Sequence, residues 1–257
     1  MRNCLVLGSG RSGTSMVTGL LSKSGYYMGA NLYPPRDRNP KGFFEDPEIN
    51  FLNEDIMALS RSPLRRLLPD KLFYFQPRNG QQWLAVVPLG TPVRDTEAIR
   101  RRITAQVAHE PYCFKDPRFS YTLPAWRPHL RNTVFVCVFR EPARTATSIV
   151  QGCKEQRYLR NLRFTYSYAR AIEMWCSMYE HVLEEHRQEG EWLFLHYNQV
   201  LDGSAFPLLE HALGARVDAG FVDSGLKRTS KSGDPGPRAM RIYGELCTLA
   251  GYAEPPA

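Results

Sequence analysis

The stretch GSGRSGTS at residues 8–15 combines three glycines with an arginine and several hydroxyl side chains. It follows a short apolar run and precedes apolar residues at helical spacing, so it predicts a loop between a strand and a helix. Unpaired N–H groups at the start of a helix attract anions, and glycine lets the backbone approach them closely. The stretch therefore predicts a loop that binds phosphate.

Two common phosphate-binding motifs fit this loop poorly. A dinucleotide-binding loop has the same glycine spacing but needs an acidic residue about 20 positions later. The segment MGANLYPPR at 28–36 has none, and Asp37 lies in a proline-rich stretch. A nucleotide-hydrolysing loop needs a lysine where Thr14 stands. Both interpretations are weak.

A second anion site is predicted after the run TVFVCVF at 133–139, which is typical of a buried strand. Arg140 follows this strand directly, Pro142 suits the first turn of a helix, and Ser148 falls within that helix. A cation at the end of a core strand repels a metal ion and attracts phosphate, which disfavours chemistry on a magnesium nucleotide. Two anion sites at neighbouring strand ends suit a ligand with two separated phosphates.

The elements that must position these residues alternate between strand and helix, which predicts an α/β three-layer sandwich with a mainly parallel central sheet. Ligands of such sheets bind beyond the carboxyl ends of the strands, so the glycine loop, Lys115, Arg140 and Tyr197 are expected to lie together. Predicted strands cover 3–7, 112–115, 133–139 and 192–196, and predicted helices cover 13–24, 47–59, 95–110, 166–188, 204–213 and 238–250, with a further helix from 142.

Composition narrows the class of partner. The 257 residues carry a formal net charge of +7, which favours an anionic partner. The sequence has no motif that reads nucleic acid, so nucleic acid is not the expected partner. No apolar run is long enough to span a bilayer, and no leader precedes the first strand, so a cytoplasmic location is expected. The six cysteines and six histidines lack metal-ligand spacing, and no metal site is expected.

On these motifs the sequence resembles the sulfotransferase family. GSGRSGTS at 8–15 is similar to its 5′-phosphosulfate loop, in the form of carbohydrate-type and bacterial members, and FREPARTATS at 139–148 to its 3′-phosphate motif. KDPR at 115–118 and LFLHYNQVL at 193–201 resemble further stretches of these proteins. The resemblance implies a P-loop-NTPase-like sulfotransferase fold, a single domain over 1–257 and a bacterial source.

The resemblance also implies a donor, 3′-phosphoadenosine 5′-phosphosulfate (PAPS), with adenosine 3′,5′-bisphosphate (PAP) as product and no metal. Arg140 and Ser148 would hold the 3′-phosphate, and Arg228 or Lys231 in a covering loop at 226–238 would close over the nucleotide. Arg144 departs from the acidic residue that many members have at this position. The 5′-phosphosulfate would be held by Arg11, Ser12, Gly13, Thr14 and Ser15.

In sulfuryl transfer by in-line displacement, a base must remove the proton of the acceptor. A cation such as Arg11 must stabilise the negative charge on the transferring group. The cytosolic branch of the family uses a histidine in the segment equivalent to KDPR, which has none here. Glu45 resembles the carboxylate base of some bacterial members; Asp116 is the main alternative and Asp46 a lesser one. Both aspartates also have structural interpretations, Asp46 as a helix cap and Asp116 in a turn before proline.

The acceptor is expected to bind an insertion or lid over 31–95, where prolines and aromatics occur without a clear period. A hydroxyl or amine on a small molecule, a glycan or a lipid would fit. Two other functions stay open: a P-loop kinase that uses Mg-ATP, and a non-catalytic nucleotide-binding protein on the same fold. The sequence does not indicate the oligomeric state.

Overall fold

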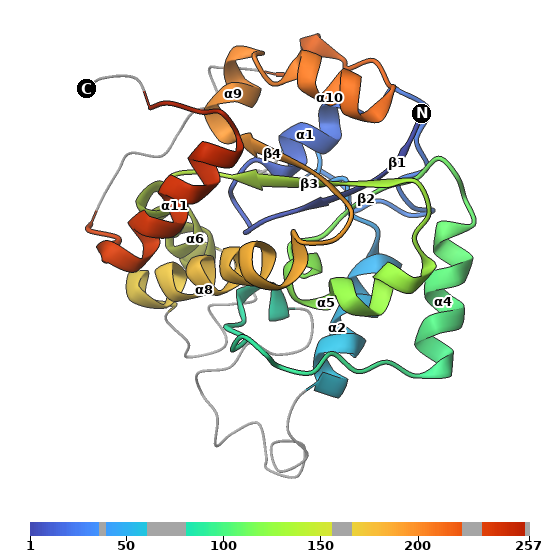
Figure 1. Ribbon diagram of the computed structural model, residues 1–257, viewed down its shortest axis with the longest axis horizontal. Coiled ribbons are helices and arrows are strands. Elements are labelled where there is room, and N and C mark those ends of the chain that lie inside the picture. Colours follow the sequence, from blue (N-terminus) through green and yellow to red (C-terminus); the bar gives the residue numbers. More distant parts are fainter. Residues whose placement is uncertain (36–39, 61–80, 156–165, 223–232, 255–257) are drawn as a thin grey trace.

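The computed structural model describes residues 1–35, 40–60, 81–155, 166–222 and 233–254. Its core is one all-parallel sheet in the order β2-β1-β3-β4, which confirms the predicted α/β class (Figure 1). Val6 pairs with Lys115 on one side of the central strand, and Leu7 pairs with Cys137 on the other. The strands are β1 (Asn3–Leu7), β2 (Cys113–Lys115), β3 (Thr133–Phe139) and β4 (Glu191–His196).

Helices cover both faces of the sheet, because alternate strand residues point to opposite sides. Leu5 and Leu7 of β1 pack with α2, α4, α5, α8 and α11, whereas Cys4 and Val6 pack with α1, α9 and α10 (Figure 1). The described helices are α1 (Thr14–Leu20), α2 (Pro47–Ser60), α4 (Glu97–Val107), α5 (Phe119–Trp126), α6 (Pro142–Glu155), α8 (Tyr168–Glu180), α9 (Tyr197–Asp202), α10 (Phe206–Leu213) and α11 (Gly236–Leu249). Short 3-10 turns lie at Gln82–Leu84, Arg127–His129 and Ala219–Phe221, and a π-helical turn at His181–His186 continues α8.

The predicted strands at 3–7 and 133–139 have the observed bounds, and the predicted helices begin within two residues of the observed ones. Helix α5 was not predicted, because Pro124 lies inside it. Proline lacks an N–H, so the carbonyl of Ser120, four residues earlier, accepts instead from Nε2 of His186 at 3.1 Å. Burial lowers the pKa of His186 to about 4, which keeps the ring neutral while it donates this bond.

The strand order places a topological switch point at the carboxyl ends of β1 and β3. The chain leaves β1 into α1 on one face of the sheet and leaves β3 into α6 on the other (Figure 1). Ligands of parallel sheets bind where neighbouring strands send their connections to opposite faces. The glycine loop and Arg140 therefore flank the expected ligand position.

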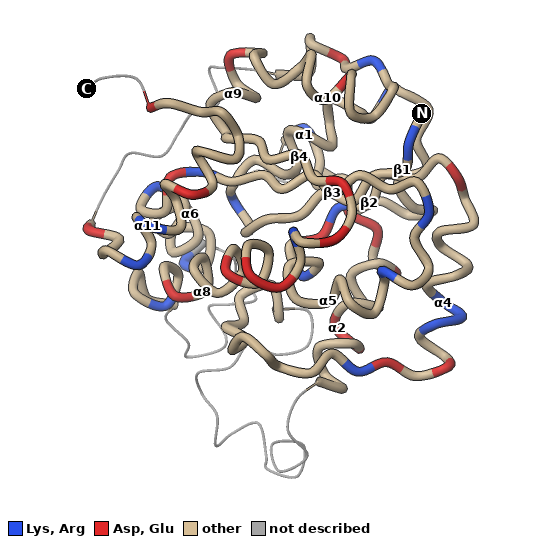
Figure 2. The backbone as a smooth tube through the Cα atoms, in the orientation of Figure 1, with Lys and Arg blue, Asp and Glu red and all other residues tan. Residues whose placement is uncertain are grey.

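Charged residues of both signs occur on the outer helices α4, α8 and α11 (Figure 2). Some of them pair between helices: Arg102 on α4 contacts Glu48 at 2.8 Å and Asp55 at 2.7 Å, both on α2. Exposed pairs of this kind contribute little stability each. No helix among the described residues combines the length and apolar character needed to cross a membrane.

Candidate active site

The glycine loop packs closely against the end of β3. A Cβ built at Gly8, where φ is 125°, would lie 2.1 Å from the carbonyl oxygen of Val138, so only glycine fits. The hydroxyl of Tyr179 donates to the same carbonyl at 2.8 Å and accepts from the Ser9 N–H at 3.1 Å. Ser12 is fully buried, and its Oγ lies 2.6 Å from Ser9 Oγ and 3.1 Å from Tyr179 Oη. The hydroxyl of Ser12 therefore belongs to the internal bonding of the loop.

The ends of three strands converge on Tyr197, as the sequence predicted. Gly13 precedes α1 with φ of 100°, and a Cβ built there would lie 2.8 Å from Cδ2 of Tyr197. The guanidinium carbon of Arg140 lies 4.4 Å from the centre of the same ring. This cation–π contact places Arg140 beside the glycine loop.

The C-terminal segment anchors the helix that carries Tyr197. The ring of His196 stacks on Tyr252 with 3.7 Å between ring centres, and Asn198 Nδ2 donates to the Tyr252 hydroxyl at 2.7 Å. Gln199 Nε2 donates to the carbonyl of Ala250 at 3.0 Å. The C-terminal segment therefore fixes the start of α9, where Tyr197 lies, through one stacking contact and two hydrogen bonds.

Arg140 is buried without full hydrogen bonding. Its side-chain Nε and Nη2 have no hydrogen-bond partner among the described residues. Burial is the main cause that lowers the pKa of Arg140, and the nearby charge of Arg144 acts in the same direction. Unpartnered polar groups are costly inside a protein, above all on a charged side chain. The free guanidinium donors therefore fit an anionic group.

Arg11 links the two anion motifs. Its Nε donates to Ser148 Oγ on α6 at 3.1 Å, and its backbone adopts a positive φ of 70°, which is uncommon outside glycine. The amino end of α6 is already capped, because the carboxylate of Glu141 accepts from the N–H groups of Ala143 at 3.3 Å and Arg144 at 2.8 Å. An anion at this strand end would therefore meet side chains rather than the helix terminus.

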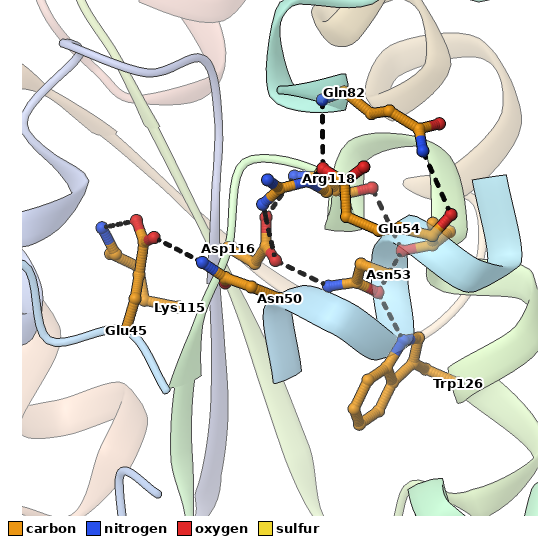
Figure 3. Close-up of polar contacts among 10 residues, drawn as sticks. Glu45, Asn50, Asn53, Glu54, Gln82, Lys115, Asp116, Arg118 and Trp126 are labelled. Atoms are coloured by element: carbon orange, nitrogen blue, oxygen red, sulfur yellow. Dashed lines mark hydrogen bonds and ion pairs between the residues drawn. The ribbon is translucent and has the colours of Figure 1, made fainter. Parts of the chain in front are cut away.

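Glu45 is held at the other end of the loop by Lys115 (Figure 3). The ammonium group of Lys115 contacts Oε1 of Glu45 and donates to Ser15 Oγ at 3.1 Å, and Asn50 Nδ2 donates to Oε2 of Glu45 at 2.9 Å. The side chain of Glu45 is 16% exposed, against 3% for Lys115. Burial alone would raise the pKa of Glu45, but Lys115 and Asn50 together hold it below its usual value. Glu45 is therefore ionised at neutral pH.

We expect Lys115→Met to raise the pKa of the Glu45 carboxyl, because burial would no longer be opposed by the ammonium charge. Carbon-detected NMR titration of the glutamate side chains should show the Glu45 signal titrating below its usual value near 4.5 in the wild type and above it in the variant. Lys23→Met is the matched control, since this exposed lysine pairs with Asp218. An unchanged Glu45 titration in Lys115→Met would contradict the assignment.

The other two predicted carboxylates have structural partners. Asp46 caps α2 by accepting from the Glu48 N–H at 2.7 Å, and it also accepts from the Asn31 N–H at 2.8 Å, which confirms the capping interpretation. Asp116 is fully buried and accepts from the backbone N–H of Arg118 at 2.8 Å, which confirms the turn. Burial raises the pKa of Asp116, and the charge of Glu45 adds to this effect while Arg118 opposes it.

A buried polar network joins Asp116 to α2, and sequence reasoning missed it. Arg118 also donates through Nε to Oε1 of Glu54 at 2.6 Å, and Asn53 Nδ2 donates to Asp116 at 3.0 Å. Asn50, Asn53 and Glu54 share one face of α2, because residues three and four apart are neighbours on a helix (Figure 3). Polar residues at this spacing on a helix with a buried apolar face were the available signal.

Two predicted residues cannot be placed in this site. Arg228 and Lys231, expected to cover the nucleotide, lie outside the described residues. The glycine loop, Arg140, Ser148 and Glu45 do come together at the carboxyl ends of the strands.

The sequence profile of the sulfotransferase family matches residues 4–204. A sulfotransferase domain from the curacin biosynthetic pathway shares the fold with a TM-score of 0.53 and 14% identity, over 99% of each chain. The sulfotransferase domain of the Synechococcus PCC 7002 olefin synthase is 17% identical, with a TM-score of 0.48 over 99% of this chain and 89% of its own. Sulfotransferase STF9 from Mycobacterium avium is 14% identical, with a TM-score of 0.47 over 96% of this chain and 68% of its own. No curated protein sequence matches the chain.

Because the family profile covers most of the chain, from β1 to the end of α9, the protein belongs to the sulfotransferase family.

Proposed function

We propose that this protein transfers a sulfuryl group from PAPS to a hydroxyl or amine of a small-molecule, glycan or lipid acceptor. The observation that carries the proposal concerns Arg140, which lies beside the glycine loop. Its buried Nε and Nη2 have no hydrogen-bond partner within the part of the chain that the structure describes. A donor with separate 3′ and 5′ phosphate groups could occupy both places at once. Membership of the family supports the same donor.

The residues at the carboxyl ends of β1 and β3 fit such a ligand. Nε and Nη2 of Arg140, with the hydroxyl of Ser148, would hold the 3′-phosphate. The 5′-phosphosulfate would lie against the loop at 11–15 and the amino end of α1, where Thr14 and Ser15 present hydroxyl groups. Ser12 would act on the shape of the loop instead, because its hydroxyl is bonded internally.

PAPS supplies an activated sulfuryl group, and the protein must stabilise charge and remove a proton. Arg11 lies within the loop, where its charge would stabilise the transferring group. Glu45 is the favoured base, because it is ionised and partly exposed, whereas Asp116 has no exposed surface. A carboxylate of lowered pKa is a weak base, so Glu45 is suited to accept a proton from an acceptor that is already becoming acidic.

Calorimetric titration with PAP, AMP and Mg-ATP tests the proposed donor. We expect PAP to bind with a Kd of about 1 μM or tighter in the presence of EDTA, and AMP to bind about 100-fold more weakly, because it lacks the 3′-phosphate that Arg140 would bind. Tight Mg-ATP binding with indifference to the 3′-phosphate would contradict the proposal and favour a kinase. PAP binding without sulfuryl transfer to any of a panel of acceptors would favour a non-catalytic role.

A further inference from the structure

Trp83 lies against the glycine loop although it is distant from it in sequence. A Cβ built at Gly10 would lie 2.8 Å from Cζ3 and 2.9 Å from Cε3 of the indole ring. The φ of Gly10 is not positive, so the ring rather than the backbone conformation requires glycine there. Trp83 remains partly exposed, and its ring borders the loop immediately before Arg11.

Both neighbours of Trp83 are anchored in the protein interior. The N–H of Gln82 donates to Oε1 of Glu54 at 3.0 Å, and its side-chain Nε2 donates to the Glu54 carbonyl at 3.2 Å. Glu54 is itself held by Arg118. On the other side, the carbonyl of Leu84 accepts from the Tyr166 hydroxyl at 2.7 Å. The chain on both sides of Trp83 is therefore held by buried hydrogen bonds.

The same helix positions Trp83 and the favoured base. Helix α2 holds Glu45 through Asn50 and holds Gln82 through Glu54, and Figure 3 shows Glu45 and Gln82 at opposite ends of this network. Glu45 reaches the loop at Ser15 through Lys115, whereas Trp83 meets it at Gly10. The loop residues 11–14, which would hold the transferring group, lie between these two positions.

We propose that Trp83 is a specificity-determining residue that forms one wall of the acceptor site. A planar apolar face of the acceptor would pack on the indole while its nucleophilic group points towards Glu45. Such a face belongs either to an aromatic ring or to the C–H side of a sugar ring, and both pack well on tryptophan. This inference rests on the proposed function, because it needs the transferring group to lie at 11–14.

Calorimetry in the presence of saturating PAP tests this role of Trp83 by measuring the affinity for two probes, 2-naphthol and methyl β-D-glucopyranoside. We expect at least one probe to bind the wild type and to bind Trp83→Ala about tenfold more weakly, with Trp83→Phe close to the wild type for 2-naphthol. The probe that binds identifies the aromatic or the sugar source. Trp192→Ala is the matched control, because Trp192 is partly exposed near the start of β4, at the opposite end of the sheet.

Equal affinities of wild type and Trp83→Ala for both probes, including no binding to either protein, overturn the inference. The affinity for PAP separates this failure from others: a wild type that does not bind PAP contradicts the proposed function itself. If Trp83→Ala loses PAP binding, its loop is disturbed. Trp83→Leu then carries the test, because it keeps apolar bulk without an aromatic ring and should lose probe affinity while retaining PAP.

Discussion

Arg140→Met is expected to lower the affinity for PAP by at least about 100-fold while leaving the unliganded protein as stable as the wild type, or more stable. Two guanidinium nitrogens of Arg140 are buried and have no partner among the residues that the structure places, so the free protein bears their desolvation and a ligand would relieve it. Methionine removes that cost and fills much of the same volume. The free energy of unfolding should rise by between 0 and about 2 kcal/mol.

Calorimetry with PAP and urea denaturation of the unliganded protein measure the two halves of this prediction. Arg101→Met is a suitable control, because Arg101 is an exposed arginine on α4 and should alter neither quantity much. A loss of several kcal/mol of stability in Arg140→Met would show that the guanidinium has an essential structural role. Unchanged PAP affinity would remove the main support for the proposed donor.

Glu45→Gln is expected to lower kcat by about 10²- to 10⁴-fold without weakening PAP binding. The amide is similar in size but cannot accept a proton, and it leaves Lys115 without its counter-ion beside Ser15 of the loop. Greater positive charge at this end of the loop should keep the affinity for PAP equal or increase it. Transfer of labelled sulfate from PAPS to an acceptor gives kcat, and calorimetry gives the affinity.

The control for this variant is Glu48→Gln, three residues along the chain, where the carboxylate pairs with Arg102 at the surface. Its kcat should stay close to that of the wild type. If Glu45→Gln keeps its kcat within about threefold, general-base catalysis by Glu45 is excluded. Asp116→Asn would then be the next variant to measure.

The parallel sheet and the meeting of its strand ends could be predicted because they depend on local patterns. The short, continuous and β-branched apolar run of β3 is typical of a buried strand. The carboxyl ends of parallel strands meet at one edge, so Arg140 was expected to lie near the glycine loop, as it does. Helix α5 was hard to predict, because it contains Pro124 and the Ser120 carbonyl, which this proline leaves without its helical partner, accepts instead from distant His186. Ser120 and His186 are 66 positions apart, and nothing local to either indicates the other.

The direction of the Glu45 pKa shift could not be predicted from the sequence either, because it depends on a partner that is distant along the chain. Two phenylalanines precede Glu45, and an apolar setting would raise the pKa of a carboxyl. The structure instead pairs Glu45 with Lys115, 70 positions away, while Phe44 packs on Phe221 with 5.5 Å between ring centres. The internal bonding of the Ser12 hydroxyl could not be predicted for the same reason, since its partner Tyr179 lies 167 positions away.

The central place of β1 in the sheet has a consequence for synthesis on the ribosome. β1 is made first, yet both its neighbours, β2 and β3, lie more than 100 residues later in the chain. At about 5–20 residues per second, roughly 7–25 seconds pass before β3 is complete. During this interval a short apolar strand lacks at least the neighbour β3, and before β2 is made it lacks both neighbours. Unpaired strand edges promote aggregation and chaperone binding. Protection of the nascent chain before residue 139 emerges should therefore favour native folding.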